Sequence, residues 1–550
     1  MSAQRIYTSP YGKFPICTNS IAEFLLTSPH LDGSSDKTLY SDVVSKKTLT
    51  VSQHYRFVRA LSATLRNHFK VKPGTVVGLL IPNDICLPAL HHAILWNLAV
   101  ISPVNIAYTQ ADFIEQMKTA KASLIIAKPG PWLKMATASQ SHVPTCAQIV
   151  NFDDLVHDAF SHLDRGSGTE GDFLPLARPA SQTLAYLCFS SGTTGKFKGV
   201  MTSHSNMTNN VLQTVRAGYP DLYSTNGVYA GILPETHIYG LQGHIHVNPY
   251  ICAHLVIFPQ FEFETMLKAI VEFKITHINI VPPIMVLLSK SALVDKYPQI
   301  RNSLKVMISG AAPLSHSLAM DVQERIGGKL VVCQGYGMTE ATPITHMSPS
   351  SRPDSKAGSI GLLVPNMEAR LVDPDTDEDV EPGTPGELLL RGPNVMMGYL
   401  ENIEATKATL INDGWLKTGD IVVIDNDGYY AVVDRSKELI KSKGFQVAPA
   451  ELEALLLRHP QVIDAAVVGH WSEAEATEQP RAFVVIAKGT QIETIHRWVD
   501  EQVAKHKRLH GGIVEVDQIP KSPSGKILRR LLKDRKDCIV SHYRLAAAKL

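Results

Sequence analysis

Residues 189–201, with the sequence FSSGTTGKFKGVM, decide how this chain is interpreted. They follow an apolar run, residues 184–188, that is typical of a buried strand. Glycines let the backbone approach a ligand closely and turn its N–H groups inward, while hydroxyl groups and lysines add donors and charge. We therefore expect a loop that binds a polyphosphate, with a flexible hairpin as the alternative. The loop residues are Ser190, Ser191, Gly192, Thr193, Thr194, Gly195, Lys196 and Lys198.

This loop is not the usual P-loop. That motif needs glycine at position 190 and serine or threonine at 197, where this chain has Ser190 and Phe197. The pattern also lacks the GxGxxG spacing of dinucleotide-binding folds. The sequence therefore indicates a phosphate site of another type.

Two further motifs carry groups that suit a nucleotide. The segment QGYGMTE, residues 334–340, closes a strand-like run, and open α/β sheets bind ligands at such strand ends. Thr339 and Glu340 supply a hydroxyl and a carboxylate that suit a phosphate and its Mg²⁺. In WLKTGD, residues 415–420, Asp420 follows a tight turn and can accept both hydroxyls of a ribose, although a surface turn is the alternative.

Two lysine-rich segments follow. Residues 434–446, DRSKELIKSKGFQ, lie where the composition changes, as is typical of a domain boundary. Residues 520–530, PKSPSGKILRR, present Lys526 on a Pro/Ser/Gly loop, from which a mobile charge can be delivered to a reaction. As isolated strings, both also fit solvated basic loops.

The order of helix-like and strand-like segments predicts the fold class. They alternate over residues 49–127 and again over 264–333, which favours parallel sheets covered by helices. Pro and Gly become frequent after residue 351, and a compact α+β pattern follows residue 434. We expect an α/β fold with a large N-terminal domain, residues 1–434, of two doubly wound sheets plus a small β-barrel. A small α+β domain is expected over residues 435–550, and the resemblance described below implies that this domain is mobile.

Composition excludes several classes of protein. The 53 basic and 52 acidic residues nearly cancel, so no global field attracts nucleic acid. The seven cysteines form no CxxC pair, which favours reduced intracellular thiols over a disulfide framework or a zinc site. The uncharged stretches 85–107 and 239–260 are interrupted by Pro, Asn and His, so buried segments are expected rather than membrane spans. The N-terminus lacks the apolar core of a signal peptide.

Taken together and in this order, these motifs resemble the adenylate-forming superfamily of acyl-CoA synthetases, luciferases and peptide-synthetase adenylation domains. The likeness covers nearly the whole chain and is greatest to the branch of 4-coumarate–CoA ligases and beetle luciferases. Further segments that carry it are HIYGL at 237–241, VPP at 281–283, SGAAPL at 309–314, GYL at 398–400 and KGFQVAPAELE at 443–453.

The resemblance implies a two-step reaction. A carboxylate attacks the α-phosphate of Mg-ATP to give an acyl-adenylate and pyrophosphate, and the thiol of coenzyme A then displaces AMP. The 190–195 loop with Lys198 would hold the β- and γ-phosphates, Thr339 would contact the α-phosphate, and Glu340 would ligate Mg²⁺. Asp420 and Arg435 would hold the ribose. The residues implied to flank adenine are Ala311, Gln334, Gly335 and Tyr336.

The resemblance also assigns roles to the C-terminal lysines. Lys526 would bridge the carboxylate and the α-phosphate during adenylation, and Lys437 would be the hinge about which the C-terminal domain rotates. Lys441 and Gln446 would serve the catalytic face of the second conformation, with Lys443 and Gly444 close to coenzyme A.

In the resemblance, His237 separates the carboxylate site from the pantetheine tunnel. The acyl pocket is expected to be mainly apolar, and either an aromatic or a fatty acid fits that expectation. Tyr239 either donates to a ring hydroxyl or simply packs. The pocket residues are Tyr239, Ile308, Gly310, Gly335, Pro343 and Ile344.

Outside the phosphate loop, four residues depart from the pattern of related ligases. Glu235-Thr236 stands where many have an apolar or aromatic pair, and Gln260 replaces a lysine that contacts coenzyme A. Ile308 replaces a lysine found in many hydroxycinnamate ligases, so the acyl pocket is expected to differ.

An acyl- or aryl-CoA ligase acting on a small-molecule carboxylic acid is the favoured function. The alternatives are an enzyme that loads a carrier protein and a luciferase-like oxygenase. The C-terminal Ala548-Lys549-Leu550 is similar to the peroxisomal Ser-Lys-Leu signal, so we expect binding to the peroxisomal import receptor, with a cytoplasmic location as the alternative.

Overall fold

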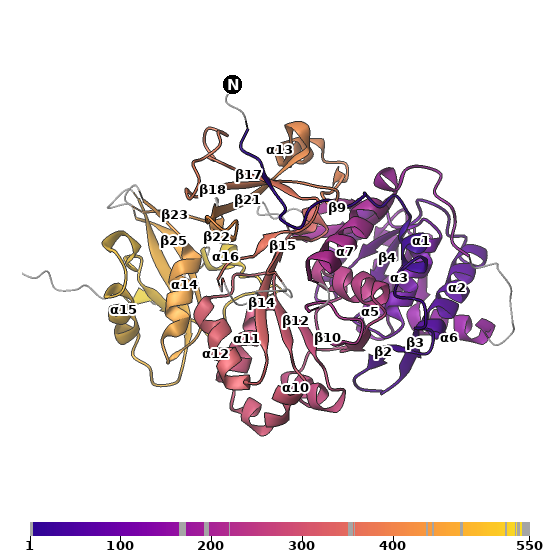
Figure 1. Cartoon of the computed structure of the whole chain (residues 1–550), viewed down its shortest axis with the longest axis horizontal. Helices are drawn as coiled ribbons and strands as arrows, with labels where there is room; N and C mark the ends of the chain where they lie inside the picture. Colours follow the sequence, from indigo (N-terminus) through magenta and orange to yellow (C-terminus); the bar gives the residue numbers. More distant parts are fainter. Residues whose placement is uncertain are drawn as a thin grey trace, which may run out of the picture.

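The fold is built on two large mixed sheets, a curled antiparallel sheet and a separate C-terminal unit (Figure 1). The structure is a computed structural model of the chain. It describes residues 4–163, 172–191, 197–218, 221–349, 356, 358–435, 438–442, 445–472, 477–522, 525–533, 535 and 540–541.

The first large sheet carries the predicted phosphate loop. Its core is parallel, and the hairpin of β8 (Leu184–Ser191) and β9 (Phe197–Ser203) brings Ser191 opposite Phe197. Residues 192–196 lie outside the described part of the chain. The strand order is β19 (Gly398–Tyr399), β9, β8, β5 (Val100–Pro103), β4 (Val76–Leu80), β6 (Leu124–Ala127) and β7 (Gln148–Asn151).

Local sequence explains the helices that connect these strands. In α2 (Val51–Asn67), Thr50 and Gln53 form a capping box, and Thr109 and Asp112 do the same for α4 (Gln110–Ala120). Between them, α3 (Leu87–Trp96) is buried on every side, which is why the uncharged stretch from residue 85 contains a core helix. The remaining helices of this unit are α5 (Pro131–Ser139) and α6 (Phe152–Leu163).

The second large sheet carries the QGYGMTE and SGAAPL segments at its strand ends. Strands β14, β13, β12, β10, β11 and β2 run parallel, so their carboxyl ends share one edge. The order is β16 (Leu362–Leu363), β15 (Ile344–Met347), β14 (Val331–Gly337), β13 (Val306–Ser309), β12 (His277–Ile280), β10 (Val228–Gly231), β11 (His254–Ile257), β2 (Thr38–Asp42) and β3 (Thr48–Thr50). Its helices include α7 (His204–Gly218), α10 (Phe263–Glu272), α11 (Pro282–Lys290) and α12 (His316–Ile326).

The uncharged stretch 239–260 forms short buried elements, as expected. They are α8 (Ile238–Gly240), the π-helical turn η4 (Leu241–Val247), α9 (Asn248–Tyr250) and β11. Within the described part of the chain, no helix is both long and apolar enough to cross a bilayer.

The predicted small barrel is a curled antiparallel sheet, open along its strand path, and so a half-barrel. It places Asp420 on a strand that faces the second large sheet (Figure 1). Its order is β1 (Tyr7–Thr8), β17 (Glu368–Val372), β18 (Gly386–Arg391), β21 (Trp415–Ile424) and β20 (Leu410–Ile411), with β22 (Tyr430–Arg435) on β21.

The C-terminal unit has its own apolar core, as the α+β pattern predicted. The strand β25 (Val462–Ser472) pairs with β26 (Thr477–Ile486), and a separate hairpin joins β23 (Ile440–Ser442) to β24 (Phe445–Val447). The boundary at residue 434 stays a prediction; β22 ends at Arg435. The other elements are β27 (Ile513–Glu515), β28 (Val540–Ser541), α14 (Pro449–Arg458), α15 (Ile492–Asp500) and α16 (Arg529–Lys533).

A chain of buried imidazoles lies between the large sheets. His54 Nε2 is 3.0 Å from His92 Nδ1, and the Tyr186 hydroxyl is 2.8 Å from His246 Nε2. Burial lowers the pKa of His91 and His244 to about 3 and that of His92 and His204 to about 4. These side chains are therefore neutral in the folded protein at pH 7.

We predict that stability falls as the pH drops from 7 to 5. The unfolded chain binds protons at these histidines from about pH 6.5 downward, whereas the folded chain does not until about pH 4 or below, and each contributes up to about 1.4 kcal/mol per pH unit in that window. Glu235 acts in the opposite direction, because burial raises its pKa. Calorimetry at pH 7.5, 6 and 5 measures the effect, and a midpoint that does not change over this range would contradict it.

Candidate active site

The ribose and adenine motifs meet at the carboxyl edge of the second large sheet. Tyr336, at the end of β14, donates its hydroxyl to Asp420 Oδ2 at 2.5 Å, which joins the QGYGMTE and KTGD segments. Asp420 is buried, and its register partner on β22 is Arg435, whose side chain lies outside the described residues. Ala311, just beyond β13, has a left-handed backbone with φ of 67°. The predicted nucleotide residues of these strands are therefore neighbours.

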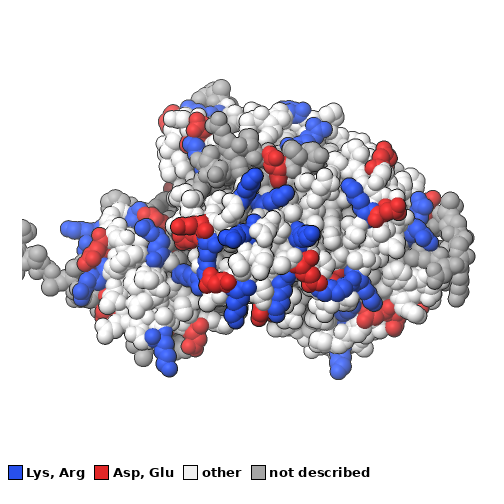
Figure 2. Space-filling model, turned by 60° about the horizontal axis from the view of Figure 1, so that its bottom comes forward, with Lys and Arg blue, Asp and Glu red and all other residues white. Residues whose placement is uncertain are grey.

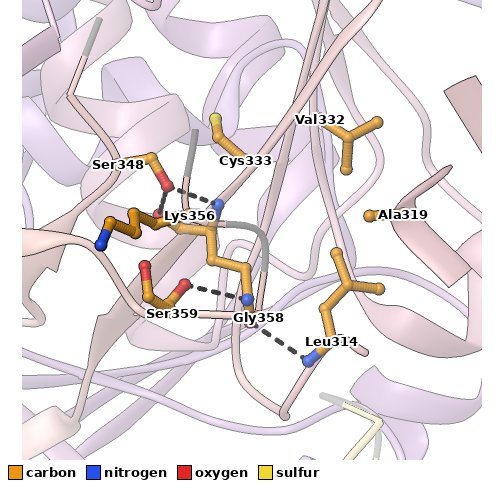
Figure 3. A pocket seen from close by; sticks show the side chains of 9 residues that line it. Leu314, Ala319, Val332, Cys333, Ser348, Lys356, Gly358 and Ser359 are labelled. Atoms are coloured by element: carbon orange, nitrogen blue, oxygen red, sulfur yellow. Dashed lines mark hydrogen bonds between the residues drawn. The ribbon is translucent and has the colours of Figure 1, made fainter. Parts of the chain in front are cut away.

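Gln334 has its side chain engaged within the protein. Its amide nitrogen donates to the Ser359 carbonyl at 3.0 Å, and its amide oxygen accepts from the Leu314 N–H at 3.1 Å (Figure 3). These contacts line a small pocket behind the strand end, together with Lys356 and Cys333. Gln334 thus fixes the 311–314 turn, and only its backbone remains for contact with a base.

A second cluster joins the predicted metal ligand to the phosphate loop. Tyr399, on β19, donates its hydroxyl to Glu340 Oε1 at 2.9 Å, and Lys198 Nζ lies 4.9 Å from the centre of the Tyr399 ring. Burial, followed by the charge of Glu340, raises the pKa of Tyr399, so the phenol stays protonated and donates. Thr339 precedes Glu340 in a short 3₁₀ turn. Glu340 thereby contacts the hydroxyl of Tyr399, and Lys198 lies over the face of the same ring.

The residues present suit a magnesium–phosphate group. Within the described part of the chain, no cluster of three metal-ligating side chains exists. Mg²⁺ commonly takes one or two carboxylates and completes its shell with water and substrate phosphates. The single buried carboxylate of Glu340, with Lys198 close by, matches that chemistry.

The turn that follows Glu340 is fixed from behind by buried amides. Asn210 Nδ2 donates to the Ile344 carbonyl at 2.7 Å, and Asn394 Nδ2 donates to the Ala341 carbonyl at 2.6 Å. Gln242 Nε2 in turn donates to Asn210 Oδ1 at 3.3 Å. These groups come from α7, from η4 and from the segment before β19, so three parts of the fold position one loop.

The predicted acyl-pocket residues pack together around the ends of β13 and β14. The Tyr239 hydroxyl donates to the Ile308 carbonyl at 2.9 Å, and a Cβ on Gly310 would lie 3.0 Å from the Tyr239 ring. A Cβ on Gly335 would lie 3.7 Å from Ile308 and 3.9 Å from Ile344. Four predicted acyl-pocket residues and Gly335 therefore line one wall. Pro343, the other predicted member, instead presents its carbonyl to Gly337.

His237, the predicted gate residue, precedes Tyr239 by two positions. His237 caps α8 by accepting the Tyr239 N–H at 3.3 Å, and burial lowers its pKa to about 4. Its imidazole is therefore neutral at pH 7. Two positions earlier, Glu235 is fully buried, and burial raises its pKa, so this departure from the related ligases places a neutral acid behind the gate.

The C-terminal unit presents the loop of Lys526 to the N-terminal part. A Cβ on Gly525 would lie 3.3 Å from Pro283 and 3.7 Å from Val281, at the end of β12. Lys521, in the same loop, pairs with Asp464 at 2.6 Å. The loop of Lys526 thus docks at the sheet edge that carries the nucleotide residues.

The hairpin of the second predicted catalytic face packs within the C-terminal unit. Lys441 and Gln446 are register partners on β23 and β24. The Lys441 N–H donates to Glu478 Oε2 at 2.8 Å, and the Thr477 hydroxyl donates to the Lys441 carbonyl at 2.8 Å. Lys437, Lys443 and Gly444 lie outside the described residues, as do Gly192, Thr193, Thr194 and Gly195.

Two regions of the chain match known protein families. Residues 30–400 match the AMP-binding enzyme family, and residues 451–526 match the AMP-binding enzyme C-terminal domain. The chain belongs to the AMP-binding enzymes. A probable 4-coumarate–CoA ligase 1 of Dictyostelium discoideum is 36% identical over 97% of this chain and 98% of its own. The 4-coumarate–CoA ligase of Pinus taeda is 36% identical over 94% of both chains.

Solved structures of similar proteins share the fold. ATP-bound MatB from Rhodopseudomonas palustris superposes with a TM-score of 0.82 at 25% identity, covering 94% of this chain and 98% of its own. The anthranilate CoA ligase AuaEII, in complex with anthranoyl-AMP, gives 0.83 at 24% identity, covering 94% and 97%. MenE of Bacillus subtilis, solved with ATP and a magnesium ion, gives 0.77 at 23% identity, covering 94% and 100%. This AMP-binding enzyme is thus an acid–CoA ligase of the AMP-forming type, as the motifs predicted.

Sequence reasoning missed several residues of this AMP-binding enzyme's site. Tyr399 lies in the GYL segment but was given no role, and the buried amides of Asn210 and Asn394 were not singled out. Asn279, on β12, is the register partner of Ile308, and its Nδ2 lies 3.2 Å from the position of a Cβ on Gly243. A polar run on a helix that is otherwise buried, such as TNNVLQT at 208–214, is the signal that such a network leaves in a sequence.

We predict that Tyr399→Phe weakens the response of this enzyme to Mg²⁺. The substitution removes the donor to Glu340 but keeps the ring beside Lys198, and a hydrogen bond to a charged group is worth about 1.5–3 kcal/mol. The half-saturating Mg²⁺ concentration for pyrophosphate release should rise about 10-fold.

Tyr336→Phe is the matched control, because it removes a hydroxyl that donates to Asp420 instead. That variant should raise the KM for ATP and leave the Mg²⁺ response near normal. Identical profiles for the two variants would contradict the assignment of separate metal and ribose sites.

Proposed function

We propose that this chain is an ATP-dependent carboxylic acid–CoA ligase whose substrate is an aromatic or a fatty acid. The observation that carries the proposal is a convergence at one sheet edge. Asp420 is held by Tyr336, and Glu340 is held by Tyr399 close to Lys198. Gly335, next to Tyr336, adjoins the apolar side chains of Ile308 and Ile344. These groups suit a ribose, a magnesium-bound triphosphate and an apolar acid that must react together.

The charged groups of the site would lower the barrier of the first half-reaction. Attack of the carboxylate on the α-phosphate brings together two anionic groups, so cations fixed beforehand lower the barrier. Glu340 would hold Mg²⁺, which neutralises phosphate charge when bound. Lys198 would bind the outgoing pyrophosphate, and Lys526 would reach the carboxylate and the α-phosphate from its docked loop.

The second half-reaction would transfer the acyl group to the thiol of coenzyme A and release AMP. The relatives named as CoA ligases support this thiol acceptor. Lys441 and Gln446, which lie side by side on their hairpin, would take the place of the Lys526 loop after the C-terminal unit rotates. Gln260, where related ligases have a lysine, would leave coenzyme A with one fewer charged contact.

The apolar character of the predicted acyl-pocket residues supports an apolar acyl group. The Tyr239 hydroxyl is bound to the Ile308 carbonyl, and Ile308 stands where many hydroxycinnamate ligases carry a lysine. A ring or an alkyl chain therefore finds a largely apolar wall. A panel of aromatic and fatty acids, assayed for pyrophosphate release with and without coenzyme A, tests the proposal. Release without thioester formation for every acid would favour a carrier-loading enzyme, and oxygen uptake would favour an oxygenase.

We predict that Lys526→Ala lowers the rate of acyl-adenylate formation by about 10²–10³-fold, because it removes one fixed donor to the transition state. The affinity for ATP should change far less, since Glu340 and Asp420 remain. Single-turnover formation of acyl-adenylate measures the effect, and a near-normal rate would refute this role of Lys526.

We also propose that Ala548-Lys549-Leu550 directs import into peroxisomes. These residues lie outside the described part of the chain, and the support is their likeness to Ser-Lys-Leu. A fluorescent protein that ends in residues 541–550 should enter peroxisomes, whereas the same fusion without Leu550 should stay diffuse. Diffuse signal from both fusions would refute the proposal.

A further inference from the structure

One helix of the N-terminal part contacts the C-terminal unit with both of its ends. At the beginning of α11, Val281 and Pro283 lie against Gly525, next to Lys526. At its end, the Lys290 ammonium donates to the carbonyls of Leu457 at 3.3 Å and Val462 at 2.8 Å. The nine residues of α11 span about 13 Å, so these are separate contacts joined by a rigid element.

The contact at Lys290 is a helix cap supplied from outside the C-terminal unit. Leu457 lies in the last turn of α14, where carbonyls lack partners within the helix and carry partial negative charge. An ammonium group at that position satisfies the carbonyl and matches the helix dipole. Asp464, on β25, adds negative charge near Lys290 and also pairs with Lys521 in the loop of Lys526. One acidic residue thus lies close to both the cap and the loop.

The end of α11 is itself held in place. Arg325, on α12, donates to the carbonyls of Ser289 at 2.5 Å and Ser291 at 2.9 Å, and it pairs with Asp295 at 2.9 Å. Arg325 therefore supplies hydrogen bonds to carbonyls at the end of α11. The Lys290 side chain extends instead to the carbonyls of the C-terminal unit. Figure 2 shows basic and acidic side chains gathered where the C-terminal unit meets the large sheets.

Because α11 is rigid, loss of the contacts at one of its ends should weaken the contacts at its other end. The hairpin of Lys441 and Gln446 packs on β26 in its own unit, whereas the Lys526 loop faces the N-terminal part. The contacts of α11 therefore belong to the orientation in which Lys526, and not the hairpin, meets the sheet edge.

We propose that α11 is the docking element for the adenylating orientation of the C-terminal unit, with Lys290 as the positioning residue that stabilises it. The inference rests on the proposed two-step ligase activity. Removing Lys290 would shift the population away from this orientation without touching a group that contacts substrate.

The test separates the two half-reactions in Lys290→Met, which keeps the apolar stem and removes the donors. Lys290 is exposed, so we expect a modest loss, about 3- to 10-fold, in the single-turnover rate of acyl-adenylate formation. Thioester formation from supplied acyl-adenylate and coenzyme A should be unchanged or faster. Lys290→Arg, which retains charge and donors, should restore adenylation. The proposal would be overturned if Lys290→Met slowed both half-reactions equally, or if it slowed neither of them.

Hydrogen exchange supplies a readout without substrate. In Lys290→Met, backbone amides of residues 520–527 should exchange faster, although they lie at the opposite end of α11. Lys329→Met, at an exposed lysine of the same unit, is the matched control and should leave both exchange and rates unchanged. Unchanged exchange at 520–527 in Lys290→Met would overturn the inference. If the unsubstituted enzyme makes no acyl-adenylate from any acid, the proposed function fails, and the exchange measurement still decides the role of α11.

Discussion

The reversal of the chain between Gly337 and Ile344 leaves no room for a side chain on its inner surface. A Cβ on Gly337 would lie 2.0 Å from the Pro343 carbonyl oxygen, which is far inside any permitted contact. Because the chain turns back so tightly, Tyr336, Glu340 and Ile344 project into three adjoining regions from one short loop. The residues proposed to hold the nucleotide, the metal ion and the acyl group are thus fixed by a single backbone path. Asn210 and Asn394 hold that path from behind, so its position is determined by α7 and by the segment that leads to β19.

The sequence predicted the elements whose signals are local. Within the alternation predicted over residues 49–127, α4 begins at the cap formed by Thr109 and Asp112, and α14 lies in the α+β pattern predicted after residue 434. Alternation of helices and strands predicted the parallel sheets, and the glycine-rich strand ends predicted which edge binds ligand. The motifs therefore predicted that the segments of Tyr336, Glu340 and Asp420 lie close together. In the structure, Tyr336 donates to Asp420, and Glu340 lies in the turn just after Tyr336.

The rest depends on contacts between distant residues, which leave no periodic signal. Tyr399 is 59 residues from Glu340, Asn210 is 134 residues from Ile344, and Lys290 is 172 residues from Val462. Each of these side chains has an ordinary local explanation as a core tyrosine, a helix amide or a surface lysine. Only the folded structure shows that they contact Glu340, the turn at Ile344 and the C-terminal unit. The barrel was predicted from the density of glycine and proline, which does not fix whether the sheet closes.

The hydrogen bond between the Tyr239 hydroxyl and the Ile308 carbonyl has a consequence for how the enzyme would discriminate between acids. A phenol that donates its proton to its own backbone has no proton left to donate to the acid. Discrimination must then come from shape, and a missing methylene in an apolar pocket changes the rate by only about 10- to 200-fold. Acids that differ by one methylene would then differ in rate by no more than that factor. The mixture of thioesters produced would follow the supply of acids in the compartment, so the metabolic identity of the product would be set as much upstream of the enzyme as within it.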